Sequence, residues 1–213
     1  MHSGVDFLGL IKLDILGNGS LSVLRDALDM IKSQSKPDPE VWNLEKCYKD
    51  IEVQKLLKNS GAKGVFYLES PAQMRLNEKT QAGEFEEIGV TSSLIRPAGT
   101  SFTETYAQRH KAQKANPHTP PDWQFVHPSL KSVLGDTHDV IAFQEDVVKI
   151  CVEIAGFSFA HADKVRKMMN SHHEGVPENY NQTRDLFISG CQKLKGLNTE
   201  QAAELWSRVA SFT

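Results

Sequence analysis

The sequence has few cysteines, and they are not arranged to build a site. Its 213 residues include only Cys47, Cys151 and Cys191, which are far apart and form no Cys-x-x-Cys pair. This spacing argues against a zinc site and against a disulfide framework. Such sparse cysteine usage fits a protein of the reducing cytoplasm, which is where we expect this chain to work.

Long hydrophobic runs and an excess of one charge are also absent. No apolar run approaches the ~20 residues that a helix needs to span a bilayer, so we expect no membrane partner. The N-terminus lacks the charged, apolar and cleavage regions of a signal peptide. The formal net charge of −3 excludes a global basic field for nucleic acid, so any such binding must rest on local patches.

What remains is the composition of an ordinary globular protein, with 39% hydrophobic and 24% charged residues. Apolar residues recur at spacings of three and four, which predicts a mainly α fold. Asp50 is a candidate N-cap, and Asn198 with Gln201 has the spacing of a capping box. We expect helices over about 20–31, 39–44, 50–61, 71–79, 83–95, 101–114, 128–134, 144–156, 160–171, 177–194 and 199–211.

A small β element is expected at the N-terminus. The apolar run over 10–16 ends at Gly17 and is typical of a buried strand. Two short runs, Val65–Leu68 and Val140–Phe143, are further strand candidates. A lone strand is not stable with open edges, so its partners are these two runs or lie outside this chain.

The run over 10–16 contains one acid, Asp14, and one cation, Lys12. A carboxylate in a buried strand is costly unless it is paired, hydrogen-bonded or bound to metal. Residues two apart in a strand point to the same face, so Lys12 and Asp14 are expected to be neighbours. They form either a simple ion pair or part of a site for nucleotide chemistry.

Several phrases further along the chain occur in the order found in one family. Together they resemble the bacterial C-family DNA polymerases, the alpha subunits of DNA polymerase III, and most closely the error-prone branch. The phrases are Gly9–Gly17, Gly64-Val65-Phe66-Tyr67-Leu68-Glu69-Ser70, Ala72-Gln73-Met74, Leu94-Ile95-Arg96-Pro97, His127-Pro128-Ser129-Leu130, Phe143-Gln144-Glu145-Asp146-Val147, Ala155-Gly156-Phe157-Ser158 and Ala162–Met169.

The resemblance implies a fragment covering the last strand of the palm and part of the helical fingers. Asp14 would then be the third of the palm aspartates that hold Mg²⁺, serving as both a catalytic and a metal-binding residue. Lys12 would contact the triphosphate. The other two palm aspartates are absent, and because one carboxylate cannot assemble a two-metal site, we expect the chain alone to be inactive.

The resemblance also implies substrate-binding residues in the fingers. Arg166 and Lys167 would meet the phosphates of an incoming nucleotide, although they could equally be a solvated basic face. Arg96 would lie near the nucleotide, or else interact favourably with a helix C-terminus. Glu69 and Ser70 would belong to the nucleotide pocket, unless Ser70 simply caps the following helix.

Departures from the family pattern weaken the expected phosphate contacts. Lys167 replaces a second arginine, Ala98-Gly99 replaces Gly-Pro after Arg96-Pro97, and Tyr67 stands where glutamine is usual. A second basic run, Arg109-His110-Lys111 with Lys114, could touch a phosphate backbone or form a solvated helix face.

The sequence therefore predicts a helical fingers-type domain with a small palm strand, divided into residues 1–33 and 34–213. In the full enzyme it would contribute to template-directed nucleotidyl transfer, with Mg²⁺ as cofactor. Its partners would be primer–template DNA, deoxynucleoside triphosphates and other polymerase subunits. The alternatives are a non-catalytic nucleic-acid-binding module and a helical interaction domain derived from polymerase fingers.

Overall fold

The computed structural model describes residues 15, 17, 19–33, 44–95, 100–118, 123–170 and 179–212. The chain divides between Tyr48 and Lys49 into two units. In the first unit, α2 (Gly19–Lys32) is a 14-residue helix with no buried residue, and α3 (Leu44–Tyr48) is a single short helix. Leu21, Val23 and Met30 of α2 are exposed.

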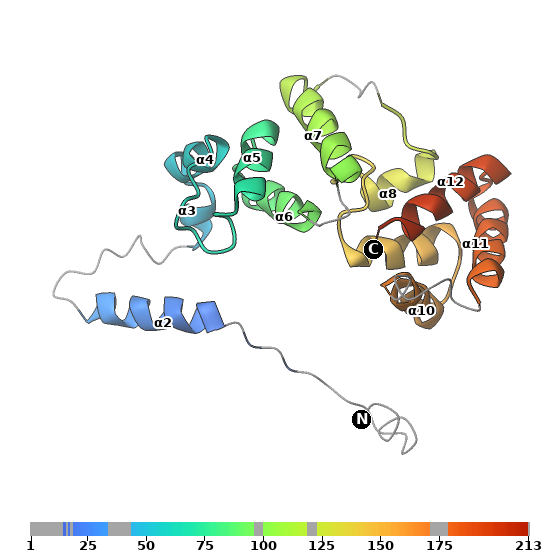
Figure 1. Ribbon diagram of the computed structural model, residues 1–213, viewed down its shortest axis with the longest axis horizontal. Coiled ribbons are helices and arrows are strands. Elements are labelled where there is room, and N and C mark those ends of the chain that lie inside the picture. The colour runs from blue at the N-terminus through green and yellow to red at the C-terminus, as the bar shows by residue number, and fades with distance from the viewer. Residues whose placement is uncertain are drawn as a thin grey trace, which may run out of the picture. The chain divides into compact units, whose positions relative to one another are not determined.

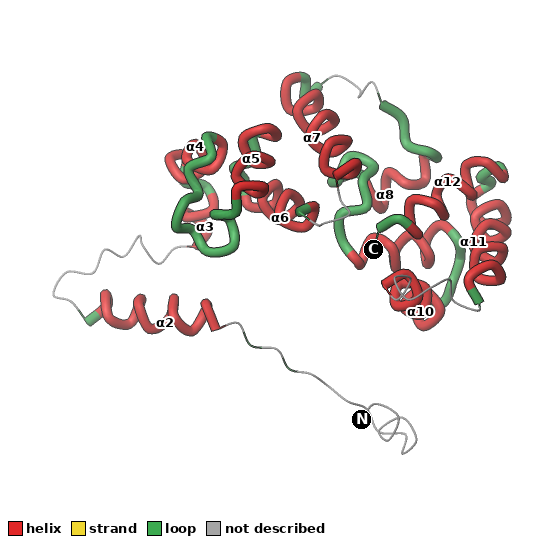
Figure 2. Tube along the Cα trace, in the orientation of Figure 1, coloured by secondary structure: helices red, strands yellow, loops and turns green. Residues whose placement is uncertain are grey.

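The second unit is built from helices (Figures 1 and 2). None of its described residues forms a strand, and no described helix has the length and apolar character needed to cross a bilayer. Its elements are α4 (Ile51–Lys58), α5 (Pro71–Thr80), α6 (Phe85–Leu94), α7 (Thr100–Ala115), the 3₁₀ turn η2 (Pro128–Leu130), α8 (Lys131–Leu134), α9 (Gln144–Lys149), the π-helical turn η3 (Ile150–Ile154), α10 (Phe159–Asn170), α11 (Tyr180–Lys195) and α12 (Thr199–Ala210).

The larger hydrophobic core of this unit lies among α9, η3, α10, α11 and α12. In it α10 packs against α9 and η3, and α11 packs against η3 and α12. Each helix contributes residues spaced three or four apart, as an amphipathic helix must. Ala162, Val165 and Met169 of α10 are almost fully buried in this core. Phe187 of α11 and Trp206 of α12 meet there with ring centroids 5.2 Å apart.

A smaller core joins α5, α6 and α7 through Leu76, Val90, Leu94 and Tyr106. Beside it lies a buried polar group made of Gln73, Asn77 and Thr91. The Gln73 amide donates to Asn77 Oδ1 at 2.9 Å and to Thr91 Oγ1 at 3.0 Å. Buried polar groups are costly unless hydrogen-bonded, so these contacts help to determine how α5 packs on α6.

The segment from Val140 to Phe143 connects the two cores. It is extended, and its residues alternate: Val140 and Ala142 enter the smaller core, whereas Ile141 enters the larger one. The preceding turn is closed by the Thr137 hydroxyl, which donates to the Val140 carbonyl at 2.6 Å. The segment thus has the two-residue period of a strand without belonging to a sheet.

Most helix predictions are confirmed, whereas the two described strand predictions are wrong. Val65–Leu68 is a turn, in which the Leu68 and Glu69 amides both donate to the Val65 carbonyl. Gly64 and Tyr67 have φ of +82° and +68°, which curls the chain instead of extending it. Val140–Phe143 is extended but lacks a partner strand among the described residues. The predicted strand over 10–16 lies outside the described residues, apart from Ile15.

The predicted helix over 144–156 is also divided in two. It begins as α9 and continues as η3, where the Ala155 amide bonds back to the Ile150 carbonyl. Helix α11 passes very close to the end of η3 at this point. A Cβ atom added to Gly190 would lie only 2.0 Å from the Ala155 carbonyl oxygen. Only glycine allows this approach.

We therefore expect Gly190→Ala to lower the free energy of unfolding by about 2 kcal/mol or more, the cost of overpacking a close contact. Urea denaturation of the full chain followed by circular dichroism measures this change. Gly89→Ala is the matched control, because Gly89 is also helical but has open space at its Cβ position. That variant should be neutral or more stable by about 0.5–1 kcal/mol from helix propensity. Equal stability of the two variants would contradict the close packing.

Candidate functional site

The outer side of α10 carries the strongest cluster of candidate ligand-binding side chains. Ser158 precedes the helix, and its hydroxyl accepts a hydrogen bond from the His161 amide at 3.3 Å, as an N-cap does. With Ala162, Val165 and Met169 buried, the helix turns Asp163, Arg166 and Lys167 away from the core. The apolar spacing therefore determines which residues face solvent.

One carboxylate holds both cations. Asp163 Oδ1 accepts hydrogen bonds from Arg166 Nε at 3.0 Å and from Nη2 at 2.8 Å, while Oδ2 pairs with Lys167 Nζ at 2.8 Å. These hydrogen bonds, first from Lys167 and then from Arg166, lower the pKa of Asp163 below its ordinary value. The three side chains carry a combined charge of +1.

A second helix contributes to this cluster. Gln144 is the first residue of α9, and its Oε1 accepts from Arg166 Nη1 at 3.0 Å. The Arg166 side chain is 25% exposed and that of Lys167 is 67% exposed. Arg166 is therefore the more tightly held of the two cations. We call Gln144, Asp163, Arg166 and Lys167 the α10 cluster.

The other predicted site residues either make only local hydrogen bonds or lie outside the described residues. Ser70 is the N-cap of α5, with its hydroxyl accepting from the Gln73 amide at 3.3 Å. Glu69 is exposed and accepts from the Gly64 amide at 3.3 Å. A role for either residue in a nucleotide pocket stays a prediction. Lys12, Asp14 and Arg96 lie outside the described residues.

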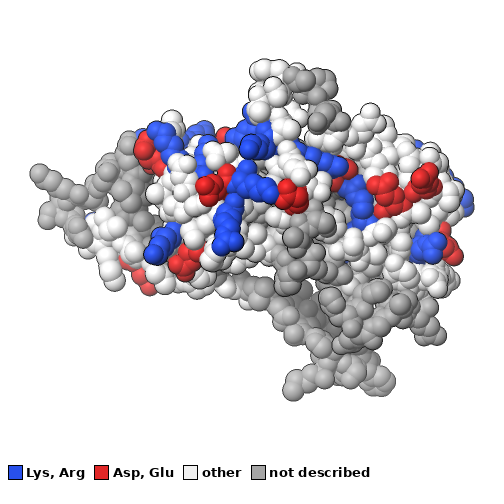
Figure 3. All heavy atoms as spheres, turned by 45° about the horizontal axis from the view of Figure 1, so that its top comes forward, with Lys and Arg blue, Asp and Glu red and all other residues white. Residues whose placement is uncertain are grey.

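The basic run on α7 is divided between inward and exposed positions. His110 is buried and Arg109 is partly buried, whereas Lys111 and Lys114 are exposed, so only the two lysines lie on a solvated helix face. Arg109 donates to the His138 carbonyl at 2.8 Å and lies over the Trp123 ring, 4.7 Å from its centroid. Lys114 pairs with Glu87 at 2.5 Å. On the face in Figure 3, basic and acidic side chains lie next to one another, without one continuous basic surface.

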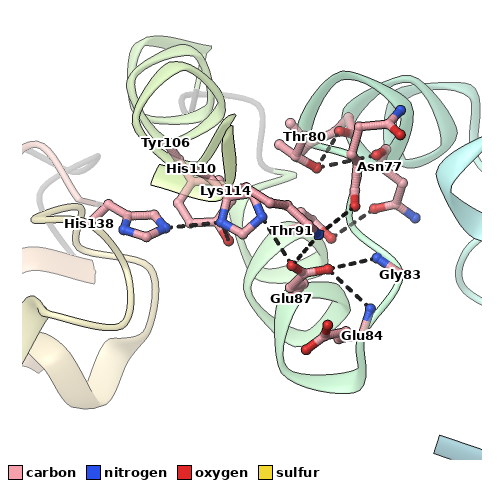
Figure 4. Close-up of polar contacts among 12 residues, drawn as sticks. Asn77, Thr80, Gly83, Glu84, Glu87, Thr91, Tyr106, His110, Lys114 and His138 are labelled. Atoms are coloured by element: carbon pink, nitrogen blue, oxygen red, sulfur yellow. Dashed lines mark hydrogen bonds and ion pairs between the residues drawn. The ribbon is translucent and has the colours of Figure 1, made fainter. Parts of the chain in front are cut away.

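Glu87 of α6 is the centre of a second polar cluster that the sequence did not reveal (Figure 4). Glu87 accepts hydrogen bonds from Lys114 Nζ and from the amides of Gly83 and Glu84, and its Oε1 lies 3.3 Å from His110 Nε2. Burial opposes ionisation of Glu87, but these partners hold its pKa well below the usual range. The capping-box spacing of Glu84 and Glu87 was the only available sequence signal.

His138 extends this cluster into the turn before Val140. Its Nε2 lies 3.0 Å from His110 Nδ1. Burial, together with the positive potential of His110 and Arg109, lowers the pKa of His138 to about 4. His138 and Asp139 have φ of +54° and +62°, which is uncommon for two consecutive residues other than glycine.

Asp139 is the most buried of the newly found charges, with 3% of its surface exposed. Its Oδ2 pairs with Arg208 of α12 at 3.0 Å and with Arg109 of α7 at 3.4 Å. Burial raises the pKa of Asp139, and both guanidinium groups oppose this rise. These partners are 69 and 30 residues away in sequence, so no local pattern could have identified them.

A cleft of about 660 Å³ lies beside this turn. Trp123, Phe125 and Pro128 supply apolar walls, and Lys131 and Gln201 supply polar groups. Among the described residues, no group of three His, Cys, Asp or Glu side chains is placed to hold a metal ion. The cleft and the α10 cluster are two places where the described residues could take a ligand.

The family model and the individual relatives that match this chain all point to the same family. Residues 20–195 match the model of the bacterial DNA polymerase III alpha subunit finger domain. The chain is 30% identical over 205 residues to an error-prone DNA polymerase of Corynebacterium jeikeium, covering 96% of this chain and 17% of that protein. It is 31% identical over 206 residues to an error-prone DNA polymerase of Corynebacterium glutamicum, and 29% identical over 205 residues to a DNA polymerase III subunit alpha of Staphylococcus epidermidis, in each case covering 96% of this chain and 18% of the relative.

The lowered pKa of His138 predicts a specific pH dependence of stability. The unfolded chain binds a proton at this residue near the ordinary value of 6.5, whereas the folded chain does so only near 4. The free energy of unfolding should therefore fall as the pH falls from 6.5 towards 4. Replacing the residue, in His138→Asn, should flatten this part of the profile in urea denaturation experiments.

His118→Asn is the control, because His118 is exposed three residues beyond the end of α7. This control should keep the wild-type slope between pH 6.5 and 4. If His138→Asn also kept that slope, the burial of a neutral His138 would be wrong.

Proposed function

The chain belongs to the family of bacterial DNA polymerase III alpha subunit finger domains, and on that premise we propose that it binds the incoming nucleotide and DNA in a DNA polymerase. The observation that carries the proposal is the α10 cluster, where Arg166 and Lys167 lie together on an outward face. The family resemblance assigns phosphate contacts to these same two residues.

The proposed reaction belongs to a longer protein. The relatives are named as DNA polymerases, and the chain spans under a fifth of their length. We propose template-directed nucleotidyl transfer for the whole enzyme, with residues 1–33 as the end of the palm and 34–213 as part of the fingers. The 213 residues alone should not catalyse it, because a two-metal reaction needs more carboxylates than Asp14.

The chemistry of the α10 cluster suits a triphosphate. The guanidinium of Arg166 is planar and offers N–H groups that match the geometry of phosphate oxygens. Lys167 adds a compact point charge that neutralises a neighbouring phosphate oxygen. Their contribution to catalysis would be positioning and charge neutralisation, since neither group needs to transfer a proton.

The remaining assignments follow from the resemblance. We propose that Lys12 and Arg96 also contact the nucleotide and that Glu69 and Ser70 line its pocket. Ser70 can cap α5 and still border a ligand, because it is exposed. Primer–template DNA, deoxynucleoside triphosphates and other polymerase subunits are the proposed partners, in the cytoplasm.

Magnesium is the proposed metal of the whole enzyme, with Asp14 as a ligand. The described residues do not by themselves fit such a metal, since none of them form a suitable group of three ligands. When bound, the metal would stabilise the attacking and leaving oxygens of the transfer. No contribution of the α10 cluster depends on it.

The proposal predicts that the isolated chain binds deoxynucleoside triphosphates through the α10 cluster. Replacing both cations, in Arg166→Ala with Lys167→Ala, should weaken dATP binding by about 10- to 100-fold, because two charge-assisted contacts are lost. Equilibrium dialysis of labelled dATP at low salt measures this change. Affinity should fall as salt is added, because the contacts are electrostatic.

Lys193→Ala with Lys195→Ala is the matched control, because these lysines lie in the last turn of α11 and are also exposed. It removes the same charge and should leave dATP affinity within about twofold, since exposed charges away from a site act weakly. The proposal fails if the wild-type chain does not bind dATP at low salt, or if both double variants behave alike.

A further inference from the structure

Arg166 is held more firmly than a surface arginine that only forms an ion pair within its own helix. Arginine has five N–H groups, and three of them donate to Asp163 and Gln144. One N–H therefore remains on each of the two terminal nitrogens. A planar group with two remaining donors is suited to two oxygens of one phosphate.

The contact between Gln144 and Arg166 orients the guanidinium and does not serve to stabilise α10. Asp163 and Arg166 are three residues apart, and such pairs commonly stabilise a helix by themselves. Gln144 lies on α9, 22 residues from Arg166, so its hydrogen bond is not one of the short-range pairs that stabilise a single helix. It instead fixes the guanidinium between two packed helices, α9 and α10.

Asp163 has two opposing effects on an anionic ligand. Its negative charge lies next to the two cations and should repel phosphate. Its hydrogen bonds restrict Arg166, so that less side-chain freedom is lost when a ligand binds. Because these effects have opposite signs, the sign of the change on removing Asp163 tells which one dominates.

We propose that Asp163 and Gln144 are positioning residues that hold Arg166 oriented for a phosphate of the incoming nucleotide. This inference rests on the proposed function, because it needs Arg166 to contact the nucleotide. Asp163 and Gln144 themselves are not required to touch the ligand. Their effect on binding should therefore disappear when Arg166 is absent.

The test measures dATP binding to the full chain and to single and double variants. Asp163→Ala should weaken binding by about three- to tenfold, the usual range for coupled side chains, although it makes the face more positive. Gln144→Ala leaves the charge unchanged and should also weaken binding. Asp163→Glu keeps a carboxylate within reach and should recover much of the affinity. In the Arg166→Ala background, Asp163→Ala should change nothing further.

Asp185→Ala is the control, because it removes one exposed acid from α11 and should not weaken binding. Thermal unfolding by circular dichroism checks that each variant is folded. Stronger or unchanged binding in Asp163→Ala would overturn the positioning role and leave the proposed function intact. An equal loss in the Arg166→Ala background would also overturn it. If Arg166→Ala alone had no effect, both proposals would fail.

Discussion

The packing of the second unit depends on the ion pairs that the buried carboxylate of Asp139 forms with two arginines. The carboxylate links α7 and α12 through Arg109 and Arg208, while the two residues that follow enter different hydrophobic cores. Breaking a buried ion pair by removing one partner typically costs about 3–5 kcal/mol, because an uncompensated charge remains. The turn can thus hold two consecutive residues in the left-handed region, a strain that its surroundings must offset.

This turn also positions the proposed site. The extended segment after Asp139 leads directly into α9, where the Asp146 carboxylate accepts from the Ala142 and Phe143 amides at 3.0 and 2.9 Å. Those bonds determine where α9 begins and hence where Gln144 lies. Because Gln144 contacts Arg166, the packing of the two cores is connected to the orientation of one guanidinium on α10.

The sequence predicted local features well and long-range ones poorly. Helices such as α10 and α12 could be predicted because their buried residues recur at helical spacing, and Asn198 caps α12 as its spacing with Gln201 indicates. The strand prediction for Val65–Leu68 is wrong, because an apolar run of four residues does not indicate that Tyr67 adopts a left-handed conformation. Within the site, the resemblance to the polymerase family was what indicated a phosphate-binding role for Arg166 and Lys167. No sequence signal indicated a role for Gln144, because its contact with Arg166 depends on how α9 packs against α10.

The central claim is that a nucleotide binds at the α10 cluster rather than in the cleft beside Trp123. The most direct measurement is a titration of the isotopically labelled full chain with dATP, following backbone amide chemical shifts by NMR. We expect the largest shifts at Gln144 and over 163–167. Shifts concentrated at Trp123, Phe125 and Lys131, with α10 unchanged, would contradict it.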